Sequence, residues 1–264
     1  MKKLFVTLAV LLTFGITRAD TEGFCSIKNN AFKNGENTSF YIFYTVAGIW
    51  VHAGTAQLIT NLERLNNKPV WHFTAIGQTN PSYDWIFKVR DNYQSYVDTT
   101  TMQPMKFLRS VEEGGYKKYE NVSFNKTTNT AIGKDGVFKI TPCIQDVVSS
   151  VYYARNMNFD SYKVGEKVNF DIFLDNEVYH IYIRYLGKET IKTRYGKFRC
   201  IKFKPLLLKS SVFEGGEKMT VWVSDDMNRL PIRIESGISV GSIKVDMMMY
   251  QNLRHPLTSL VSIR

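Results

Sequence analysis

Several residues have types and spacings that could carry chemistry, and the closest match is to a hydrolase motif. Gly237-Ile238-Ser239-Val240-Gly241 fits the G-x-S-x-G pattern, in which the serine is a nucleophile. That nucleophile needs a strand, a sharp turn and a helix in succession. Here apolar and polar residues alternate on both sides of the motif, which is typical of strands. The sequence therefore favours a connection between two strands over a catalytic Ser239.

The histidines and acidic residues do not form a recognisable metal-binding motif. None of His52, His72, His180 and His255 lies within four residues of another histidine or of a cysteine, whereas zinc sites usually contain local ligand pairs. Asp225-Asp226-Met227-Asn228 offers oxygen ligands for calcium, but it lacks the length and spacing of a calcium loop. We interpret it as a turn. No catalytic residue, metal or cofactor is predicted, and a non-enzymatic protein is expected.

Two glutamates belong to an internal repeat. Lys33 to Phe43 resembles Lys163 to Phe173, and in each copy a Gly-Glu pair precedes a β-rich run. The repeat predicts two similar halves. Glu36 and Glu166 could form a catalytic pair of carboxylates, but the favoured interpretation is that each caps or pairs within its own turn.

Aromatic residues are the strongest remaining signal. In Phe40-Tyr41-Ile42-Phe43-Tyr44 they fall on both faces of one predicted strand. A second apolar face must be covered or must bind a ligand, and core packing is the default because aromatic residues dominate ordinary cores. The candidate ligand-binding residues are four tryptophans in predicted strands: Trp50, Trp71, Trp85 and Trp222.

The elements that would position these residues are mostly strands. Residues 218–250 alternate with period two through three runs separated by turn residues, which predicts an antiparallel meander. Similar short runs fill the rest of the chain, including one over Trp85 to Asp91, and Gly54 and Gly187 are expected to interrupt strands. Helical spacing occurs once and predicts one short helix over Cys143 to Arg155, whose apolar stripe is interpreted as core.

These elements predict an all-β protein. The expected architecture is a large antiparallel rolled sheet or barrel-like body of two pseudo-repeated halves, with one short helix near residues 143–155. A single all-β domain is predicted over residues 20–256, with halves of about 24–142 and 156–254, followed by a tail over 257–264. The strand order cannot be deduced from the sequence.

The first nineteen residues have the pattern of a signal peptide. Two lysines precede an apolar run over Leu4 to Ile16, and Thr17-Arg18-Ala19 fits a cleavage site. The run is shorter than the roughly 20 residues that a membrane-spanning helix needs. Phe24 before Cys25 disfavours a lipid anchor. An exported chain permits disulfides, and Cys25, Cys143 and Cys200 allow either free thiols or one pair with one free thiol.

The net positive charge of the chain does not by itself identify a binding partner. Removing the first nineteen residues, which hold three of the 34 basic residues, leaves 31 basic against 24 acidic residues, a net charge of about +7. This excess could serve an anionic envelope partner such as lipid headgroups or acidic glycan. The alternative is that Lys and Arg solvate the outer face of strands. No nucleic-acid-binding module and no transmembrane span are expected in the mature chain.

Several segments together resemble a known family. They are Asn34-Gly35-Glu36, Asp146 to Arg155, Tyr162 to Glu166, Gly196-Lys197-Phe198, and Val221 to Asp226 leading to Leu230 to Ile234. With these segments the chain resembles exported Gram-negative bacterial proteins of domain of unknown function family 3108. The resemblance implies an envelope or periplasmic location and an all-β, barrel-like or spirally rolled fold. It implies no established activity and supplies no catalytic residues to carry over. A looser likeness is to periplasmic carriers of lipoproteins and lipids.

These observations predict an exported envelope protein that binds an apolar or amphipathic ligand, lipid or glycan, on a curved sheet. The alternative is a structural or interaction protein that docks a protein partner in the cell envelope. The oligomeric state and the identity of the ligand are not predicted.

Overall fold

Alternating apolar and polar residues fold into strands along almost the entire chain. The structure, a computed structural model, describes residues 27–46, 49–208, 215–238 and 241–263. The predicted signal peptide over 1–19, Cys25 and Ser239 lie outside these residues. Fifteen strands join into one antiparallel sheet, so the all-β prediction is confirmed.

The strands follow the predicted runs closely. Their bounds are β1 Glu36–Val46, β2 Ile49–Leu65, β3 Lys68–Thr79, β4 Arg90–Asp98, β5 Pro104–Glu113, β6 Tyr116–Asn125, β7 Thr130–Gly133, β8 Gly136–Lys139, β9 Lys167–Leu174, β10 Glu177–Lys192, β11 Gly196–Pro205, β12 Met219–Ser224, β13 Pro231–Gly237, β14 Ser242–Gln251 and β15 Leu260–Ile263. Within the described ranges, four short helical segments interrupt them: the 3₁₀ turns Pro81–Tyr83 and Phe159–Ser161, and the helices α1 Asp84–Phe87 and α2 Val147–Ala154.

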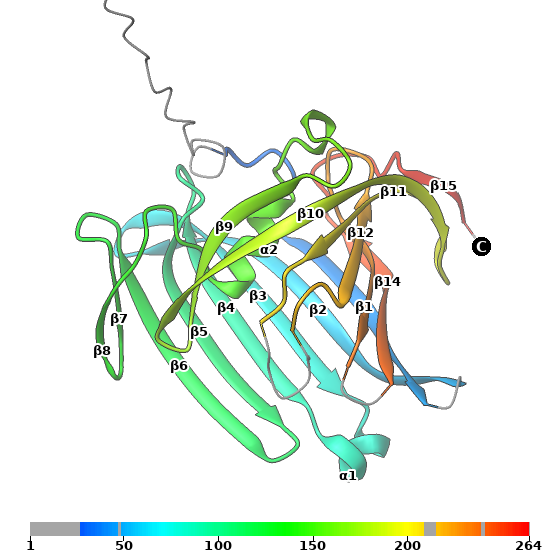
Figure 1. Ribbon diagram of the computed structural model, residues 1–264, viewed down its shortest axis with the longest axis horizontal. Helices are drawn as coiled ribbons and strands as arrows, with labels where there is room; N and C mark the ends of the chain where they lie inside the picture. The colour runs from blue at the N-terminus through cyan, green and yellow to red at the C-terminus, as the bar shows by residue number, and fades with distance from the viewer. Residues whose placement is uncertain (1–26, 47–48, 209–214, 239–240, 264) are drawn as a thin grey trace, which may run out of the picture.

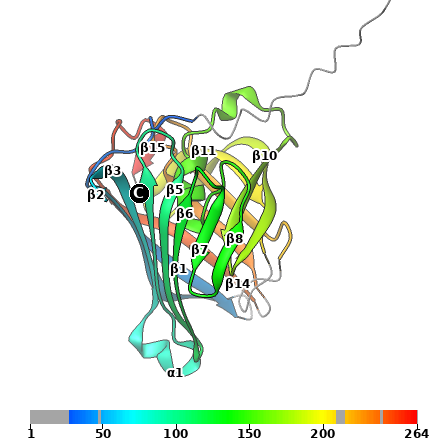
Figure 2. The same ribbon diagram turned by 90° about the vertical axis from the view of Figure 1, so that its left-hand side faces the viewer.

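The sheet consists of two meanders that meet at β1. Strands β1 to β8 pair in sequence order, as do β9 to β14, and β1 pairs with β14 to join the two sets. The sheet rolls around α2 without closing, because its two edge strands, β8 and β9, do not pair with each other (Figures 1 and 2). The connections from each odd-numbered strand to the next even-numbered strand all lie at one end of the roll. This end is the lower one in Figure 1, and we call it the lower rim.

The two repeated turns have the same backbone geometry. Gly35 N donates to Thr60 O and Gly165 N donates to Tyr185 O, each at 2.8 Å. Both glycines have positive φ, +79° and +91°, a conformation that favours glycine. Each turn precedes the first strand of its meander, so the repeat marks the two halves of the sheet.

Two predicted strand breaks are bulges instead. The pairing of β1 with β2 shifts register near Gly54, and the pairing of β10 with β11 shifts near Gly187. A Cβ on Gly54 would lie 2.2 Å from Gln78 O, so glycine is needed where β2 and β3 approach closely. The strands continue past both positions because a bulge bends a strand without ending its hydrogen bonds.

The helices differ from the sequence prediction in two places. The segment predicted as a strand from Trp85 contains α1, since the connection from β3 to β4 starts with Pro81 and turns helical there. The predicted helix is confirmed but shorter, because Asp146 caps it one residue before Val147 and Arg155 is its C-cap. Among the described residues, no helix has the length and apolar composition needed to span a bilayer.

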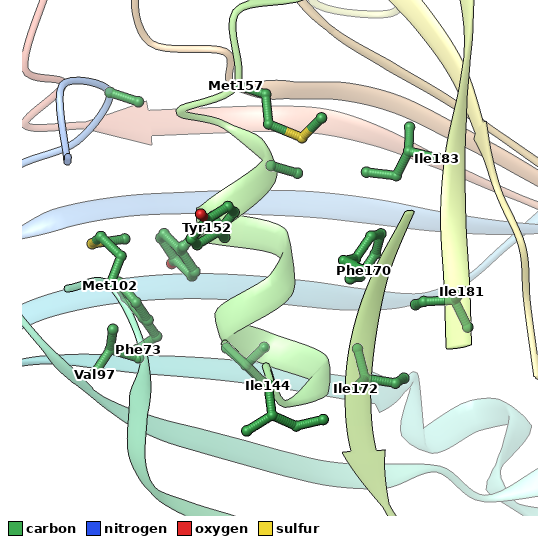
Figure 3. Close-up of a cluster of buried hydrophobic side chains, with 14 of the residues drawn as sticks. Phe73, Val97, Met102, Ile144, Tyr152, Met157, Phe170, Ile172, Ile181 and Ile183 are labelled. Atoms are coloured by element: carbon green, nitrogen blue, oxygen red, sulfur yellow. The ribbon is translucent and has the colours of Figure 1, made fainter. Parts of the chain in front are cut away.

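The main core lies between α2 and the sheet. The Tyr152 ring stacks on Phe73 of β3 at a centroid distance of 3.7 Å and meets Phe32 edge-on at 5.2 Å. The Tyr152 hydroxyl and Thr60 Oγ1 are 3.1 Å apart. Figure 3 shows this core on one side of α2, with Phe170 of β9 and Ile183 of β10 on the other.

A second apolar cluster is covered by the C-terminal segment. It contains Trp222 and Cys200, and Leu253, Leu257 and Leu260 pack against it. The residues from 257 onward, expected to form a tail, therefore contribute β15, which pairs with β11. A short strand with little alternation gave no signal of its own in the sequence.

Candidate functional site

A cavity of about 730 Å³ lies inside the roll, between α2 and strands β9 to β12. Branched aliphatic and aromatic side chains dominate its lining. They include Val147, Val151, Phe159, Phe170, Ile172, Leu174, Ile181, Ile183, Phe203, Leu206, Leu207, Leu208, Met219, Val221, Val223 and Ile234. A cavity of this size and character can hold a small apolar molecule.

Strand alternation places these side chains on one face. On β9, Phe170, Ile172 and Leu174 are two residues apart, and Ile181 and Ile183 have the same spacing on β10. Every second side chain points to the same face of a strand, so neighbouring strands present their aliphatic residues to the cavity together.

Helix α2 separates the core from the cavity. Val148 and Tyr152 are buried in the core, whereas Val147, Ser150, Val151 and Ala154 line the cavity. Val151 retains 40% of its surface exposed, which is unusual for an aliphatic residue inside a roll. The predicted apolar stripe is therefore core on one side only, and its other side is a wall of the cavity.

Polar contacts hold the N-terminal end of α2 against β4. Asp146 Oδ1 accepts hydrogen bonds from the backbone N–H groups of Val148 and Ser149, both at 2.8 Å. Its other carboxylate oxygen accepts one from Ser95 Oγ at 2.5 Å. Burial raises the pKa of Asp146 to about 6, although these hydrogen bonds oppose the shift.

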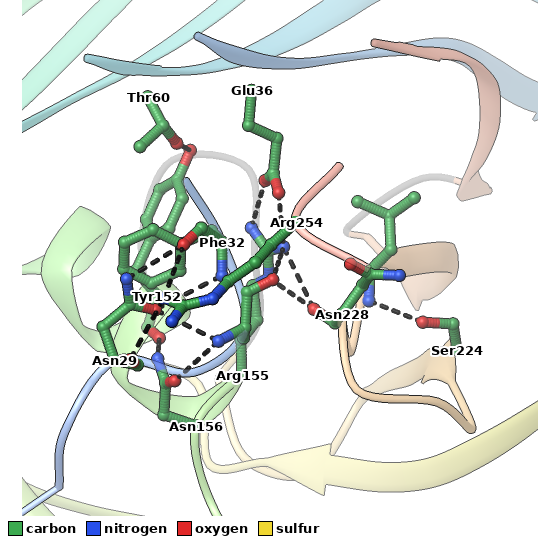
Figure 4. Close-up of polar contacts among 12 residues, drawn as sticks. Asn29, Phe32, Glu36, Thr60, Tyr152, Arg155, Asn156, Ser224, Asn228 and Arg254 are labelled. Atoms are coloured by element: carbon green, nitrogen blue, oxygen red, sulfur yellow. Dashed lines mark hydrogen bonds and ion pairs between the residues drawn. The ribbon is translucent and has the colours of Figure 1, made fainter. Parts of the chain in front are cut away.

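The C-terminal end of α2 is fixed by a buried ion pair, shown in Figure 4. Arg155 Nη1 is 2.6 Å from Glu36 Oε1, and Arg155 Nη2 donates to Asn228 O at 3.0 Å. Glu166, the repeat counterpart of Glu36, instead accepts from Lys163 N within its own turn at 2.9 Å. The interpretation that both glutamates serve their own turns therefore holds for Glu166 and is wrong for Glu36. No sequence pattern could pair residues 119 positions apart.

Charged side chains close the seam between the two edges of the sheet near the cavity. Arg109 of β5 and Lys118 of β6 both contact Asp175, which lies in the turn between β9 and β10. Arg109 Nε is also 2.7 Å from Glu120 Oε2, and Asn176 Nδ2 donates to Asp135 Oδ2 at 2.9 Å across the seam. Side chains thus join edges that backbone pairing leaves open.

The cavity opens at the lower rim, where its lining becomes polar. Tyr93, Arg109, Glu113, Tyr116 and Asp175 contribute to the lining there. Burial, followed by the carboxylate of Glu113, raises the pKa of Asp91 beside this mouth to about 7. Burial also raises the pKa of the Tyr93 phenol, so its hydroxyl stays neutral and can both donate and accept hydrogen bonds.

Arg109 and Tyr93 were not predicted as functional residues. The sequence did contain a hint at Arg109, because it alternates with the apolar residues Phe107 and Val111 and therefore shares their buried face of β5. A charge at such a position needs a partner when buried. The partner, Asp175, comes from the other meander and could not be identified from spacing.

The four candidate tryptophans are spread over the molecule, and none of them is among the residues that line this cavity. Trp71 packs edge-on against Phe32 at 5.3 Å in the main core. The Trp222 indole N–H donates to Glu189 in the second cluster. Trp50 is half-exposed at the start of β2, and Trp85 is 83% exposed on α1.

The histidines and the acidic turn have local structural partners. His72 is 2.8 Å from Glu63 and stacks on Tyr96, and His180 is 2.6 Å from Asp171. Asp226 Oδ1 accepts from Asn228 N at 3.0 Å, which supports the turn interpretation of residues 225–228. Across the described ranges, no three His, Cys, Asp or Glu residues are grouped as a metal site would require.

The rolled sheet, the enclosed helix and the apolar cavity define a barrel-like all-β protein. A family model described as "Protein of unknown function (DUF3108)" matches residues 39–248. The chain belongs to this family, as its sequence motifs predicted. A search among curated proteins finds no match.

A solved structure shows a similar fold. A β-barrel-like protein of domain of unknown function DUF1849 from Brucella abortus has a TM-score of 0.56 at 6% identity, covering 84% of this chain and 99% of that chain. A proposed exported protein with a YmcC-like fold from Bacteroides fragilis has a TM-score of 0.35 at 9% identity, and a proposed lipoprotein from Parabacteroides distasonis has 0.38 at 14%. Each of these covers 86% of this chain and 99% of its own. The last two scores are too low to support an argument.

Proposed function

We propose that this protein is an exported binding protein whose cavity holds an apolar or amphipathic ligand, with a lipid as the best fit. The observation that carries the proposal is the cavity of about 730 Å³ lined mainly by aliphatic and aromatic side chains. Ligand sites commonly measure about 300–1,000 Å³ and bury most of their ligand. Transfer of an apolar chain from water to such a lining lowers the free energy of the system.

The distribution of polar groups favours a lipid over a glycan. Polar lining residues gather at the two ends, with Tyr93 and Arg109 at the mouth and Ser150 and Arg155 along α2. Arg155 is already engaged by Glu36 and Asn228. A glycan would lose hydrogen bonds to water along its whole length, and burying unpaired hydroxyl groups costs about 1–3 kcal/mol each. An amphipathic chain needs polar partners at its head alone.

The mouth can receive a polar head group. The Tyr93 hydroxyl and the Arg109 guanidinium lie at the mouth together with Glu113, Tyr116 and Asp175, next to the apolar part of the lining. Arg109 is held by Glu120 and Asp175, so it is oriented before a ligand arrives. The expected pose places the apolar chain toward Phe159 and α2, and the head toward the lower rim.

Two features support export. The first is the signal-peptide pattern over residues 1–19. The second is that Cys143 is disulfide-bonded, because disulfides persist in oxidising compartments and are rare in the cytosol. Cys200, by contrast, is a buried free thiol.

A substitution that fills the cavity tests the proposal. Val151→Trp adds volume from the exposed cavity side of α2 without displacing a buried side chain, and Val137→Trp makes the same change on β8, outside the cavity lining. Lipids extracted from each purified protein are identified by mass spectrometry, and a fluorescent fatty acid is titrated into delipidated samples.

The expected result is retained binding in Val137→Trp and at least about tenfold weaker binding in Val151→Trp, because overpacking an apolar site costs about 1–3 kcal/mol. Circular dichroism confirms that both variants are folded. Unchanged binding in a folded Val151→Trp variant would place the ligand elsewhere and refute the proposal.

A further inference from the structure

The lower rim exposes aromatic and aliphatic side chains that the proposed cavity does not use. On α1, Trp85 is 83% and Ile86 63% exposed, and Phe87 is partly exposed beside them. These three residues are called the aromatic tip. Figures 1 and 2 both show α1 projecting beyond the ends of the strands. Large apolar side chains grouped at a projecting point usually mark a contact surface.

The aromatic tip is held in place by its surroundings. Asp84, the first residue of α1, accepts from Thr79 Oγ1 at 2.7 Å and pairs with Arg90 Nη2 at 2.5 Å. Phe87 packs on the turn between β5 and β6, where a Cβ on Gly114 would lie 2.3 Å from its ring. The sheet therefore presents Trp85 and Ile86 outward in a defined position.

A basic patch lies where the turn between β10 and β11 meets β1, β2 and β14 near their lower ends. Lys244 Nζ sits 4.0 Å from the centroid of the Trp50 ring, and the Arg194 guanidinium lies 4.6 Å from that of Phe43. Lys192 joins them around an open depression of about 390 Å³. We call Lys192, Arg194, Lys244 and Trp50 the basic patch.

The cations of this patch form no ion pairs among the described residues, although Glu235 of β13 lies opposite Lys244 in the strand register. Asp246, the acidic residue of the depression, is bound by Arg233 through contacts of 2.5 and 2.7 Å. Within the part of the chain that the structure describes, Lys192, Arg194 and Lys244 have no carboxylate within ion-pair distance. The patch therefore offers positive charge to an external anion.

The aromatic tip and the cavity mouth lie on the lower rim, and Trp50 and Lys244 of the patch lie within two residues of the lower ends of β2 and β14. Asn80, which leads into α1, donates from its backbone N–H to Ala53 O at 2.8 Å and from Nδ2 to His52 O at 2.9 Å, close to Trp50. On the other side, the turn that carries Gly114 leads to Tyr116, a residue of the cavity lining. A flat surface that touches the rim would face the mouth.

We propose that the lower rim docks the protein on an anionic lipid bilayer, with the aromatic tip inserted at the interface and the basic patch on the headgroups. This inference rests on the proposed function, since docking would set the cavity mouth against the source of its ligand. Tryptophan favours the membrane interface, where its ring is partly buried and its N–H stays hydrated. Lysine and arginine beside it are attracted to anionic lipid headgroups.

A protein partner would also cover apolar side chains, but cations without ion-pair partners favour the anionic surface.

Co-sedimentation with vesicles tests the docking. The full mature chain is mixed with phosphatidylcholine vesicles that contain or lack phosphatidylglycerol. Two variants address the two features separately: Trp85→Ser with Ile86→Ser, and Lys192→Glu with Arg194→Glu and Lys244→Glu. The matched controls are Tyr119→Ser, which is exposed on β6, and Lys68→Glu with Lys139→Glu and Lys163→Glu, which are exposed and lie away from the rim.

The wild-type protein and both controls should bind vesicles that contain phosphatidylglycerol and bind neutral vesicles weakly. Loss of the tip should lower the partition coefficient at least about tenfold. Each surface cation contributes about fivefold to affinity for an anionic membrane, so the triple charge reversal should reduce binding by about a hundredfold or more.

Several results of the sedimentation experiment would overturn the docking proposal. They are binding of the wild-type protein that ignores phosphatidylglycerol, tip variants that sediment like Tyr119→Ser, or charge effects that are equal in the triple variant and its control. Fatty acid titration of the same variants in the absence of vesicles separates the two proposals, because failure of docking alone leaves cavity binding intact. Conversely, a Val151→Trp variant that loses fatty acid binding but still sediments with vesicles would show that docking does not depend on an occupied cavity. Wild-type protein that ignores vesicles but pulls down one envelope protein through the tip would indicate a protein partner and refute bilayer docking.

Discussion

Arg155 Nη1 and Glu36 Oε1 lie 2.6 Å apart in a buried ion pair that joins the end of α2 to the start of β1. Both side chains are almost fully buried, so their charges depend on each other and on the Asn228 carbonyl. The pair lies between two halves of the sheet and next to a cavity wall. It therefore determines where α2 sits, and with it the shape of the cavity.

Removing one partner of this pair should destabilise the protein strongly. We expect Arg155→Met or Glu36→Gln to lower the free energy of unfolding by about 3–5 kcal/mol, because an uncompensated buried group remains. Combining the two substitutions should cost less than their sum. Urea unfolding followed by tryptophan fluorescence measures these values.

The internal repeat provides the matched control for this experiment. Glu166 occupies the same turn position as Glu36, but it is exposed and bonds within its own turn. Glu166→Gln should therefore cost less than about 1 kcal/mol. Equal losses at the two glutamates would contradict the structural role assigned to the ion pair.

Asp91 should make the protein less stable as the pH rises toward neutral. Burial and the neighbouring Glu113 raise its pKa from 3.8 to about 7. Between these pH values the folded protein binds more protons than the unfolded chain, so the free energy of unfolding falls as pH rises. Asp91→Asn should make this decline shallower, as thermal unfolding midpoints measured across the same pH window would show.

Part of the decline should remain in that variant, because the pKa of Asp146 is also raised, to about 6, and has the same sign. Asp135→Asn, at an exposed turn residue, serves as the control. A pH dependence in Asp91→Asn that matches the wild type would show that the carboxyl at the mouth does not retain its proton in the folded state.

The two described cysteines should respond differently to a thiol reagent. Cys200 is buried, and desolvation, with a smaller effect from Glu189, raises its pKa to about 12. Because the thiolate is the reactive form, iodoacetamide should not modify Cys200 in the native protein and should modify it in denaturant. Cys143 should stay unmodified under both conditions without a reductant, since it is disulfide-bonded.

Peptide mass spectrometry locates the label on each cysteine. Rapid labelling of native Cys200 would contradict its burial beneath the C-terminal segment. We also expect Cys143→Ser to destabilise the protein by about 2–4 kcal/mol, the usual contribution of a disulfide.

Local patterns allowed most of the strands and α2 to be predicted. The alternation around Phe170 to Leu174 and around Val221 to Val223 identified strands because the period of two is a local property of the backbone. Polar turn residues marked their ends. The one strand predicted in error, over Trp85 to Asp91, has a proline ahead of it that starts a helical turn.

The candidate site was much less accessible to sequence reasoning. The tryptophans are the largest side chains in the predicted strands, yet the cavity is formed by ordinary aliphatic residues such as Ile183 and Val151, which cannot be told from core residues in the sequence. Whether a valine faces a filled core or an empty space depends on what lies opposite. In α2 the two cases occur one residue apart, at Val147 and Val148.

The sequence by itself therefore determined the class of fold, the order of the strands along the chain, the short helix and the internal repeat, since each depends on residues close together. The tertiary structure decided which strands meet, as with β1 and β14, and which charges pair, as with Arg109 and Asp175. It also decided where the roll leaves space. These contacts join residues far apart in the chain, and their positions depend on sheet twist and curvature accumulated over many strands. No local period carries that information.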